Sequence, residues 1–465
     1  MPRPLSPRRR RHALLLALAL GLLASLPAAA PATAAPPVAR QFPYCSWWLT
    51  TTPQTANVAF PDAAATYWTT PFLAADGAGI EVDGTFPDAR YMSFNVYDET
   101  FGSFTANGVS SGMADYLIAP ASGSVNPFQS AGAPGGAFSL TLSGDAQPGQ
   151  PNTLPLAPSG ETAGKLGAPI GYLVYRTYLP TGGYPTVDLP TLTLVDGEQR
   201  VTLPRCPAAT GRLAARARAG AQAARRAARA LARRLDVTPA AAARAALKGI
   251  GRRLAQAGSG GTSPCRGSAC PPSLRFFRAK ASTTNAFFPN VDNAYVSALF
   301  RPRVGTVIVV RGKAPTAPAG TNPVPWPQAS LQLRYWSLCN NIYRQPWPVV
   351  ANPRPGGGVD YGCADDDATT LDDNGDYAFV VAREHQQRAV ERAGGTFVPL
   401  SATQPRARQL LILRNMLPNA TFDHAVQDAP QDGDPASAAQ AMGAYYPRAY
   451  RCTLPQLEAG SPRCG

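Results

Sequence analysis

The stretch FPDAAATYW, residues 60–68, returns with the same spacing as FPNVDNAYV, residues 288–296. Thirteen residues after the Tyr of each copy comes IEVDGTFP (80–87) or IVVRGKAP (308–315). The 28 positions from 60 to 87 therefore align on 288–315 at a constant offset of 228, without a gap. Self-similarity over this length indicates an internal duplication, and a duplication constrains the whole architecture.

Three further pairs of segments follow in the same order in both copies. They are ARYMSFNVYD (89–98) with LRYWSLCNN (333–341), AFSLTLS (137–143) with YAFVVA (377–382), and YLVYRTYLP (172–180) with LLILRNMLP (410–418). Each is a short run of β-type residues bounded by Gly, Pro, Asn or Asp, and RYMSFNV alternates with a period of two. We therefore predict an all-β protein made of tandem duplicated antiparallel β-sandwiches that are jelly-roll-like.

The predicted domain boundaries follow from this repeat and from changes in composition. They are a signal peptide at 1–34, a first β-sandwich at 40–206, a basic Ala/Arg-rich helical linker at 207–262, a second β-sandwich at 265–425, and a C-terminal helix with a disulfide-stapled tail at 426–465. The signal peptide is indicated by a basic start, the apolar run ALLLALALGLLASL (13–26) and the small-residue cleavage pattern Ala32-Thr33-Ala34. We expect a secreted or extracytoplasmic protein of the cell envelope.

The basic character of the chain is confined to two segments. The formal charge is +14, but 1–34 carries five basic residues, and 207–262 carries twelve basic residues and one acid. Subtracting both segments leaves −2 for the rest of the chain. A nearly neutral body makes nucleic acid an improbable partner for the β-sandwiches.

The segment 207–262 is rich in Ala and Arg, which favour helix, and a break is expected near Asp236. A solvated helical linker explains it, because charge runs are commonly exposed faces. The alternative is an electrostatic anchor to an anionic envelope polymer, to the lipid headgroups of a membrane surface or to nucleic acid. No oligomeric state is predicted.

Eight cysteines in an exported chain favour a disulfide framework. Order and the repeat suggest the pairs Cys45–Cys206, Cys265–Cys270, Cys339–Cys363 and Cys452–Cys464. Each bridge would stay within one copy or its flank, as expected if the halves fold separately.

Arginines occur at matching places in the two copies, and Arg90 and Arg334 each precede a tyrosine. The set comprises Arg90, Tyr91, Arg176, Arg334, Tyr335 and Arg414. A buried guanidinium must be paired, so each Arg could form a structural pair with a carboxylate within its own sandwich, such as Asp98 or Asp292. The alternative is a pocket for a carboxylate or phosphate ligand, because Arg binds these groups in a bidentate manner.

Several of these segments together resemble an uncharacterised family of exported bacterial proteins with paired β-sandwich domains of unknown function. The resemblance rests on FPNVDNAY, the Arg-Tyr-x-Ser strands, NGVSSGMADYLIAP (107–120) and the closing Arg strands, within 57–190 and 285–420. It implies a fold and an exported setting, but no activity. The first copy departs from the second by having Ala64 where the second has Asp292.

One short motif could supply a catalytic nucleophile. GVSSG (108–112) matches G-x-S-x-G with Ser110 as the central residue, and His385 and His424 follow the signal region. A nucleophile elbow, however, needs a strand before it and a helix after it, and the flanking residues do not predict a helix.

LDDNGDY (371–377) places Asp372, Asn374 and Asp376 at alternate positions, like the start of a calcium loop. Asn374-Gly375 is also a strong hairpin signal, and it is the favoured interpretation. No cofactor is predicted, and calcium is the only alternative.

We therefore expect a non-catalytic exported binding or structural protein. The alternative is a secreted envelope hydrolase that uses Ser110, with His424, or a carboxylate pair.

Overall fold

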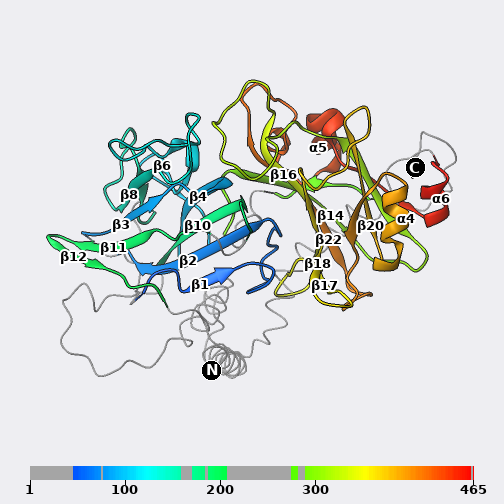
Figure 1. The fold of residues 1–465 in the computed structure, drawn as a ribbon, viewed down its shortest axis with the longest axis horizontal. Helices are drawn as coiled ribbons and strands as arrows, with labels where there is room; N and C mark the ends of the chain where they lie inside the picture. The colour runs from blue at the N-terminus through cyan, green and yellow to red at the C-terminus, as the bar shows by residue number, and fades with distance from the viewer. Residues whose placement is uncertain are drawn as a thin grey trace, which may run out of the picture.

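The structure, a computed structural model, describes residues 45–74, 77–158, 170–183, 187–206, 274–280, 288–461 and 464. The predicted signal peptide, the basic segment 207–262 and the Cys265–Cys270 pair lie outside these residues. Within them the chain is all-β: strands in several mostly antiparallel sheets dominate, and the helices are few and short (Figure 1). We call 45–206 the first half and 274–464 the second half.

The first half contains two five-stranded sheets. One has the order β1 (Leu49–Thr51), β2 (Ala65–Leu73), β10 (Ile170–Pro180), β4 (Ala89–Tyr97) and β7 (Gly112–Ala114). The other has the order β12 (Gln199–Thr202), β11 (Thr191–Asp196), β3 (Ala78–Thr85), β8 (Ala137–Ser143) and β9 (Thr153–Pro155). All these pairings are antiparallel except that between β8 and β9.

The second half contains a five-stranded and a four-stranded sheet. The first has the order β13 (Phe277–Arg278), β14 (Asn293–Phe300), β22 (Gln409–Pro418), β16 (Leu333–Ile342) and β19 (Cys363–Asp365). The other has the order β21 (Thr396–Pro399), β20 (Asp376–Ala382), β15 (Val307–Lys313) and β23 (Arg448–Cys452). Only β20 and β21 run parallel among these strands.

The strands that carry the repeated sequences occupy matching places in the two halves. In each first sheet, the Arg-Tyr strand (β4 or β16) pairs with the closing Arg strand (β10 or β22), which pairs with the strand after Phe-Pro (β2 or β14). A short hairpin lies between the Arg-Tyr strand and the next strand of its sheet: β5 (Thr105–Ala106) with β6 (Val109–Ser110), and β17 (Ala351–Pro353) with β18 (Val359–Tyr361). The parallel pair at the edge of each second sheet also matches.

Helices are confined to short connections and to the C-terminal part of the chain. They are η2 (Asp115–Leu117), η4 (Glu384–Gln386), α4 (Gln387–Arg392), η5 (Val426–Asp428), α5 (Pro435–Met442), η6 (Gly443–Tyr445) and α6 (Leu454–Glu458). The Asp434 side chain caps α5 by accepting from the N–H of Ala436. The helix ends at Gly443 (φ 55°), because glycine readily adopts this conformation.

The segment after 425, predicted to be a helix and a separate tail, contributes a strand to the second half. Strand β23 pairs with β15 over five residues, from Val307 opposite Cys452 to Arg311 opposite Arg448. Ala449 is buried in the main core of the second half, and Cys452 is buried in another cluster, with Val307 and Val309 of β15. Burial on both of its faces explains why β23 joins the sheet.

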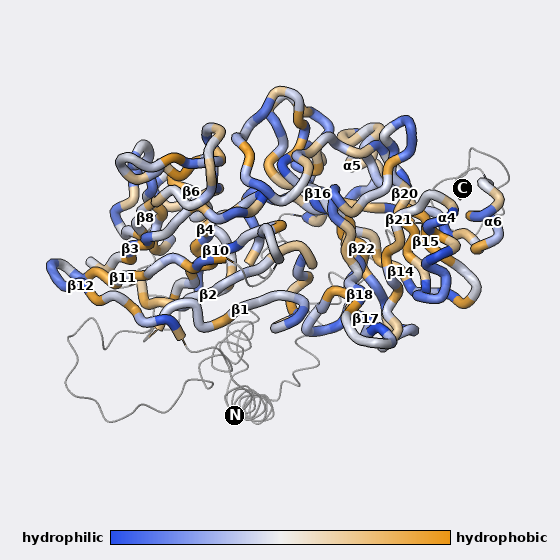
Figure 2. The backbone as a smooth tube through the Cα atoms, in the orientation of Figure 1, coloured by the Kyte–Doolittle hydropathy of each residue, from blue (hydrophilic) through white to orange (hydrophobic). Residues whose placement is uncertain are grey.

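Each half has its own apolar core, and hydrophobic stretches follow the strands of both halves (Figure 2). On β4, Met92, Phe94 and Val96 face the core of the first half. Tyr91 and Tyr97, on the opposite face of the same strand, belong to two other clusters that include residues of the second half. This second face of the sheet forms the candidate site.

Candidate functional site

The two halves meet through tyrosine-rich faces of their first sheets. Tyr91 and Tyr178 of the first half form one buried cluster with Tyr335 and Met416 of the second. The rings of Tyr178 and Tyr335 meet edge to face, with centroids 5.0 Å apart. All four residues are at most 1% exposed, so the arginine–tyrosine set predicted from the repeat lies at a closed interface.

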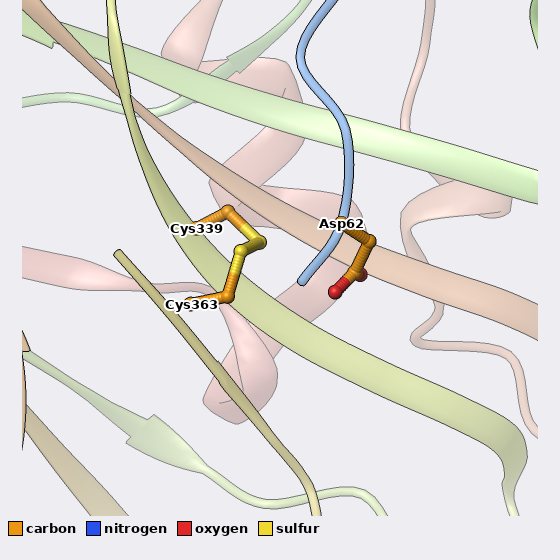
Figure 3. Close-up of side chains that lie close together, drawn as sticks. All are labelled: Asp62, Cys339 and Cys363. Carbon is orange, nitrogen blue, oxygen red and sulfur yellow. A yellow bond between two sulfur atoms is a disulfide. The ribbon is translucent and has the colours of Figure 1, made fainter. Parts of the chain in front are cut away.

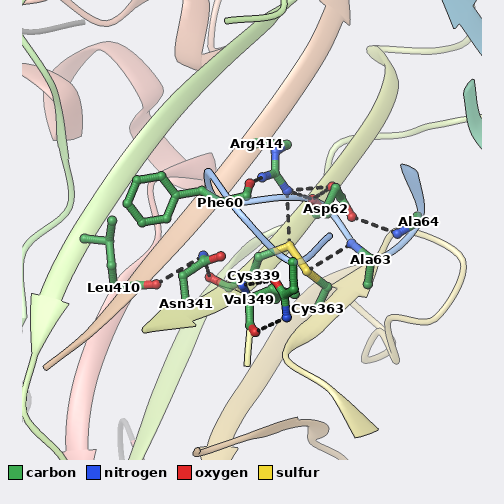
Figure 4. Close-up of a disulfide and its surroundings, with 12 residues drawn as sticks. Phe60, Asp62, Ala63, Ala64, Cys339, Asn341, Val349, Cys363, Leu410 and Arg414 are labelled. Carbon is green, nitrogen blue, oxygen red and sulfur yellow. Dashed lines mark hydrogen bonds and ion pairs between the residues drawn. A yellow bond between two sulfur atoms is a disulfide. The ribbon is translucent and has the colours of Figure 1, made fainter. Parts of the chain in front are cut away.

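The Phe-Pro loop of the first half, residues 60–64, inserts into the second half (Figure 4). Oδ2 of Asp62 accepts hydrogen bonds from Nη1 of Arg414 at 2.6 Å, Tyr335 OH at 2.9 Å and Ser337 Oγ at 2.8 Å. The carbonyl of Phe60 accepts from Nη2 of Arg414 at 3.0 Å. Asp62 is 0% exposed, and it is the buried counter-ion of Arg414.

The corresponding loop of the second half, residues 288–292, inserts into the first. Asp292 accepts from Tyr91 OH, and the carbonyl of Pro289 accepts from Tyr97 OH at 2.9 Å. A Cβ at Gly112 would lie 2.4 Å from Val291 Cγ2, so this close approach requires glycine.

Backbone hydrogen bonds from the two loops also join the halves in both directions. The N–H of Phe288 donates to the carbonyl of Phe101 at 3.0 Å, and the N–H of Phe60 donates to that of Trp347 at 2.8 Å. The two halves have therefore exchanged equivalent loops.

Arg90 and Arg334 cross the interface in opposite directions. Arg90 pairs with Asp366 at 2.7 Å and with Asp367 at 2.6 Å, both in the second half. Arg334 pairs with Asp115 of the first half at 3.3 Å and donates twice to the carbonyl of Arg90. Both guanidinium groups are completely buried.

The expectation of a pair inside each sandwich is wrong for Arg90, Arg334 and Arg414. Asp98, one suggested partner, instead accepts from the backbone N–H groups of Thr100 and Gly102 in a local turn. Asp292, the other suggestion, bonds Tyr91 across the interface. For Arg414 the cause is the loop exchange, which brings Asp62 of the first half to it. Asp115 and Asp366 instead follow the edge strands β7 and β19, and each meets the Arg-Tyr strand of the other half.

Burial dominates the ionisation of this interface. It raises the pKa of Asp115 to about 6, although Arg334 acts in the opposite direction. Burial also raises the pKa of Tyr97 to about 12 and that of Tyr335 well above 10. The tyrosines are therefore neutral at physiological pH, and their hydroxyls act as hydrogen-bond donors.

The Cys339–Cys363 disulfide joins β16 to β19 at directly opposed positions. Its sulfurs lie within 4.8 Å of an oxygen of Asp62, a spacing that could suit a metal ion (Figure 3). The sulfurs are bonded to each other, so no thiolate is available as a ligand. Arg414 donates to Cys339 Sγ at 3.1 Å and Ala63 N–H to Cys363 Sγ at 3.4 Å, which makes the disulfide part of the loop's docking site.

Two more disulfides, Cys45–Cys206 and Cys452–Cys464, occur in the described residues. With Cys339–Cys363 they match pairs expected from the order of the cysteines. Disulfides indicate an oxidising, extracytoplasmic environment. In the part of the chain that the structure describes, no helix has both the length and the apolarity to cross a membrane.

The candidate catalytic residues lie in separate local structures. Ser110 ends β6 in a short hairpin, where its Oγ accepts from the N–H of Gly112. This is not the strand-to-helix turn of a nucleophile elbow. Nδ1 of His424 is paired with the carbonyl of Ala441, and its ring stacks on Tyr445.

The acidic loop at 371–377 is a hairpin turn. Asp372 Oδ1 accepts from the N–H groups of Asn374 and Asp376, and these bonds lower the pKa of Asp372. Gly375 has φ 73°, as the turn requires. Asp372 thus caps a turn between β-type segments.

The sequence prediction missed Asp62, Asp115 and Asp366. The repeat held a usable signal for two of them, because MAD (113–115) and ADD (364–366) each follow the Arg-Tyr strand and place Asp115 and Asp366 at matching positions. Asp62 had no such signal, since the matching residue in the second copy is Asn290.

No family model and no curated protein matches the sequence. Among solved structures the chain is similar to an uncharacterized protein from Burkholderia cenocepacia, with a TM-score of 0.47 and 12% identity over 97% of this chain and 91% of that one. It is also similar to a protein from Vibrio parahaemolyticus, with a TM-score of 0.39 and 12% identity over 84% of this chain and 90% of that one. Neither neighbour is described by a function, in agreement with the resemblance of the sequence to an uncharacterised family.

Proposed function

We propose that this protein is an exported, non-catalytic binding or structural protein of the cell envelope, built from two copies of one jelly-roll-like β-sandwich. The duplication is supported by the gapless match of 60–87 on 288–315 and by the matching strand orders of the two halves. The exchanged loops support it further, because each half contacts the other through equivalent positions.

The observation that carries the non-catalytic proposal is the pairing of Arg90, Arg334 and Arg414 across the interface. Their partners are carboxylates of the same chain, Asp366 and Asp367, Asp115, and Asp62. Residues that resemble an anionic-ligand pocket in the sequence thus act as interior contacts that fix the two halves to each other. An anionic ligand would then bind at the outer surface of the protein or at a segment attached to the folded halves.

The attached segment that we assign to binding is 207–262. Its net charge of +11 suits an anionic envelope polymer or an anionic membrane surface, at about 1 kcal/mol per basic residue near a charged surface. It follows Cys206, whose disulfide to Cys45 fixes the end of the first half. The folded body would thus hold a polycationic segment at a defined place.

Deleting 211–258 tests this role. We expect the midpoint of thermal unfolding to change by no more than a few degrees, because the apolar content of the segment is mainly Ala and buries little area. Binding to heparin and to vesicles containing anionic lipid, measured at low salt, should fall at least tenfold.

The matched control keeps the length of the segment and replaces its twelve basic residues by Gln. It should lose binding as the deletion does. Full binding by either variant would contradict the proposal, and loss of soluble protein only in the deletion would show that the segment packs as core.

Ser110→Ala separates this function from the hydrolase alternative. Ser110 is exposed and bonds only its own turn among the described residues, so the substitution should leave thermal unfolding unchanged. Hydrolysis of ester and peptidoglycan substrates by purified protein should be at background for both proteins. Turnover by the wild type that falls at least a thousandfold in Ser110→Ala would establish the hydrolase instead.

A further inference from the structure

Arg176 has hydrogen-bond donors that the described residues leave unfilled. It lies on β10 and is 0% exposed. Its Nη2 donates to Tyr97 OH at 2.5 Å, but Nε and Nη1 have no hydrogen-bond partner among the described residues. Unpaired N–H groups on a buried cation are strongly unfavourable, so the position calls for an acceptor.

Arg414, at the matching place on β22, shows what that acceptor would be. Its Nη1 bonds the carboxylate of Asp62 at 2.6 Å, and its Nη2 bonds the carbonyl of Phe60 at 3.0 Å. The same side chain in the same sheet position is thus satisfied mainly by an anionic oxygen.

The second copy of the Phe-Pro loop does not supply this oxygen. Asn290 stands where the first loop has Asp62, and its amide is already engaged. Its Oδ1 accepts from the N–H of Asp292 at 3.1 Å, and its Nδ2 donates to Tyr91 OH at 3.2 Å. Asp292 lies two residues further along, and its carboxylate accepts from Tyr91 OH. Its charge is close enough to interact with Arg176, but it accepts no hydrogen bond from Nε or Nη1 of Arg176.

Tyrosine rings and hydroxyls also lie close to Arg176. The guanidinium lies over the ring of Tyr67, 5.5 Å from its centroid, and Tyr67 OH is 3.4 Å from Tyr178 OH. Burial raises the pKa of both tyrosines above 10, so both keep their protons. These tyrosines give Nε and Nη1 of Arg176 no acceptor, and two free donors on a buried cation suit a small anion.

We propose that Arg176 is the centre of a buried anion-binding site that takes a monovalent anion of chloride size, in the position that Asp62 fills at Arg414. The anion is a structural ligand: it completes the contact of residues 288–292 with the first half. The site arises because the duplicated loops differ: the second has Asn290 and Asp292 where the first has Asp62 and Ala64.

Diffraction from crystals of the mature protein soaked in sodium bromide tests the site directly. We expect an anomalous bromide peak within hydrogen-bonding distance of Arg176 and no peak at Arg414, where Asp62 already occupies the position. Arg414 is thus a control inside the same crystal. A water molecule alone at Arg176, or bromide peaks of equal height at both arginines, would overturn the proposal.

A second measurement works in solution and uses the pair of substitutions Asn290→Asp and Asp292→Ala. Together they give the second loop the Phe-Pro-Asp-x-Ala pattern of the first and move the carboxylate to the place of Asp62. For the wild type, replacing gluconate by chloride at equal ionic strength should raise the melting temperature by about 2 °C. The double variant should show no chloride-specific rise, and a rise equal to that of the wild type would refute the assignment.

Discussion

Replacing Asp62 by alanine should lower the free energy of unfolding by about 3–5 kcal/mol, because it leaves the Arg414 guanidinium buried without its counter-ion. The carboxylate accepts from Arg414, Tyr335 and Ser337, and the pair with Arg414 is at most 3% exposed on either side. Denaturant unfolding of purified, disulfide-intact protein measures the loss. Asp83→Ala, which removes an exposed carboxylate from β3, should cause no measurable change.

A second substitution separates loss of the ion pair from loss of packing. Arg414→Met combined with Asp62→Ala removes both charges, so the double variant should be more stable than Asp62→Ala alone. Additive effects of the two substitutions would show that Asp62 and Arg414 do not act as a pair. That outcome would also contradict the conclusion that the inserted loop of residues 60–64 stabilises the contact between the two halves.

Replacing Cys45 and Cys206 by alanine should lower the free energy of unfolding by about 4–5 kcal/mol, according to the chain-entropy relation for loop closure. The bond closes a loop of 161 residues and ties the two ends of the first half. Next to it, the backbone of Ser46 forms two hydrogen bonds with the backbone of Pro204 and Cys206, so we expect the native strand pairing to survive at low temperature. Far-ultraviolet circular dichroism would test the fold, and guanidinium unfolding would measure the loss.

The matched control is removal of the Cys452–Cys464 bond. That bond closes only 12 residues, so the same estimate gives a smaller loss of about 3 kcal/mol. If both double variants lost equal stability, loop closure would not be the source of the effect. Peptide mapping without reductant would confirm that the remaining bonds are correctly paired.

Periodicity and the repeat predicted much of the fold. The two-residue alternation of RYMSFNV correctly separated Met92 and Phe94 from Tyr91 and Ser93, since the first two pack in the core and Tyr91 lies at the interface. The order of the cysteines predicted the three disulfides of the described residues, because each pair flanks one repeat, one loop or the tail. These features depend on local pattern or on order along the chain.

The partners of the arginines could not be found in this way. Arg414 and Asp62 are 352 positions apart, and Arg90 and Asp366 are 276 apart. A salt bridge needs only that two side chains meet in space, and nothing in the sequence marks Asp62. The repeat places Asp115 and Asp366 at matching positions, but it does not show that the pairs cross between the halves. The position of Arg176 on the interface face, opposite to that of Arg90, also depends on how the sheets pack.

The exchanged loops have a consequence for the order in which the chain acquires its structure. As synthesis proceeds from the N-terminus, the first half is complete before residues 288–292 and Asp366 exist. Until then the hydroxyls of Tyr91 and Tyr97 lack the acceptors that the second half supplies, and Arg90 lacks its carboxylates. Contacts at such long separations form slowly. We therefore expect the first half to remain an incompletely packed intermediate, exposed to proteases and chaperones, until the second half emerges and the two loops cross.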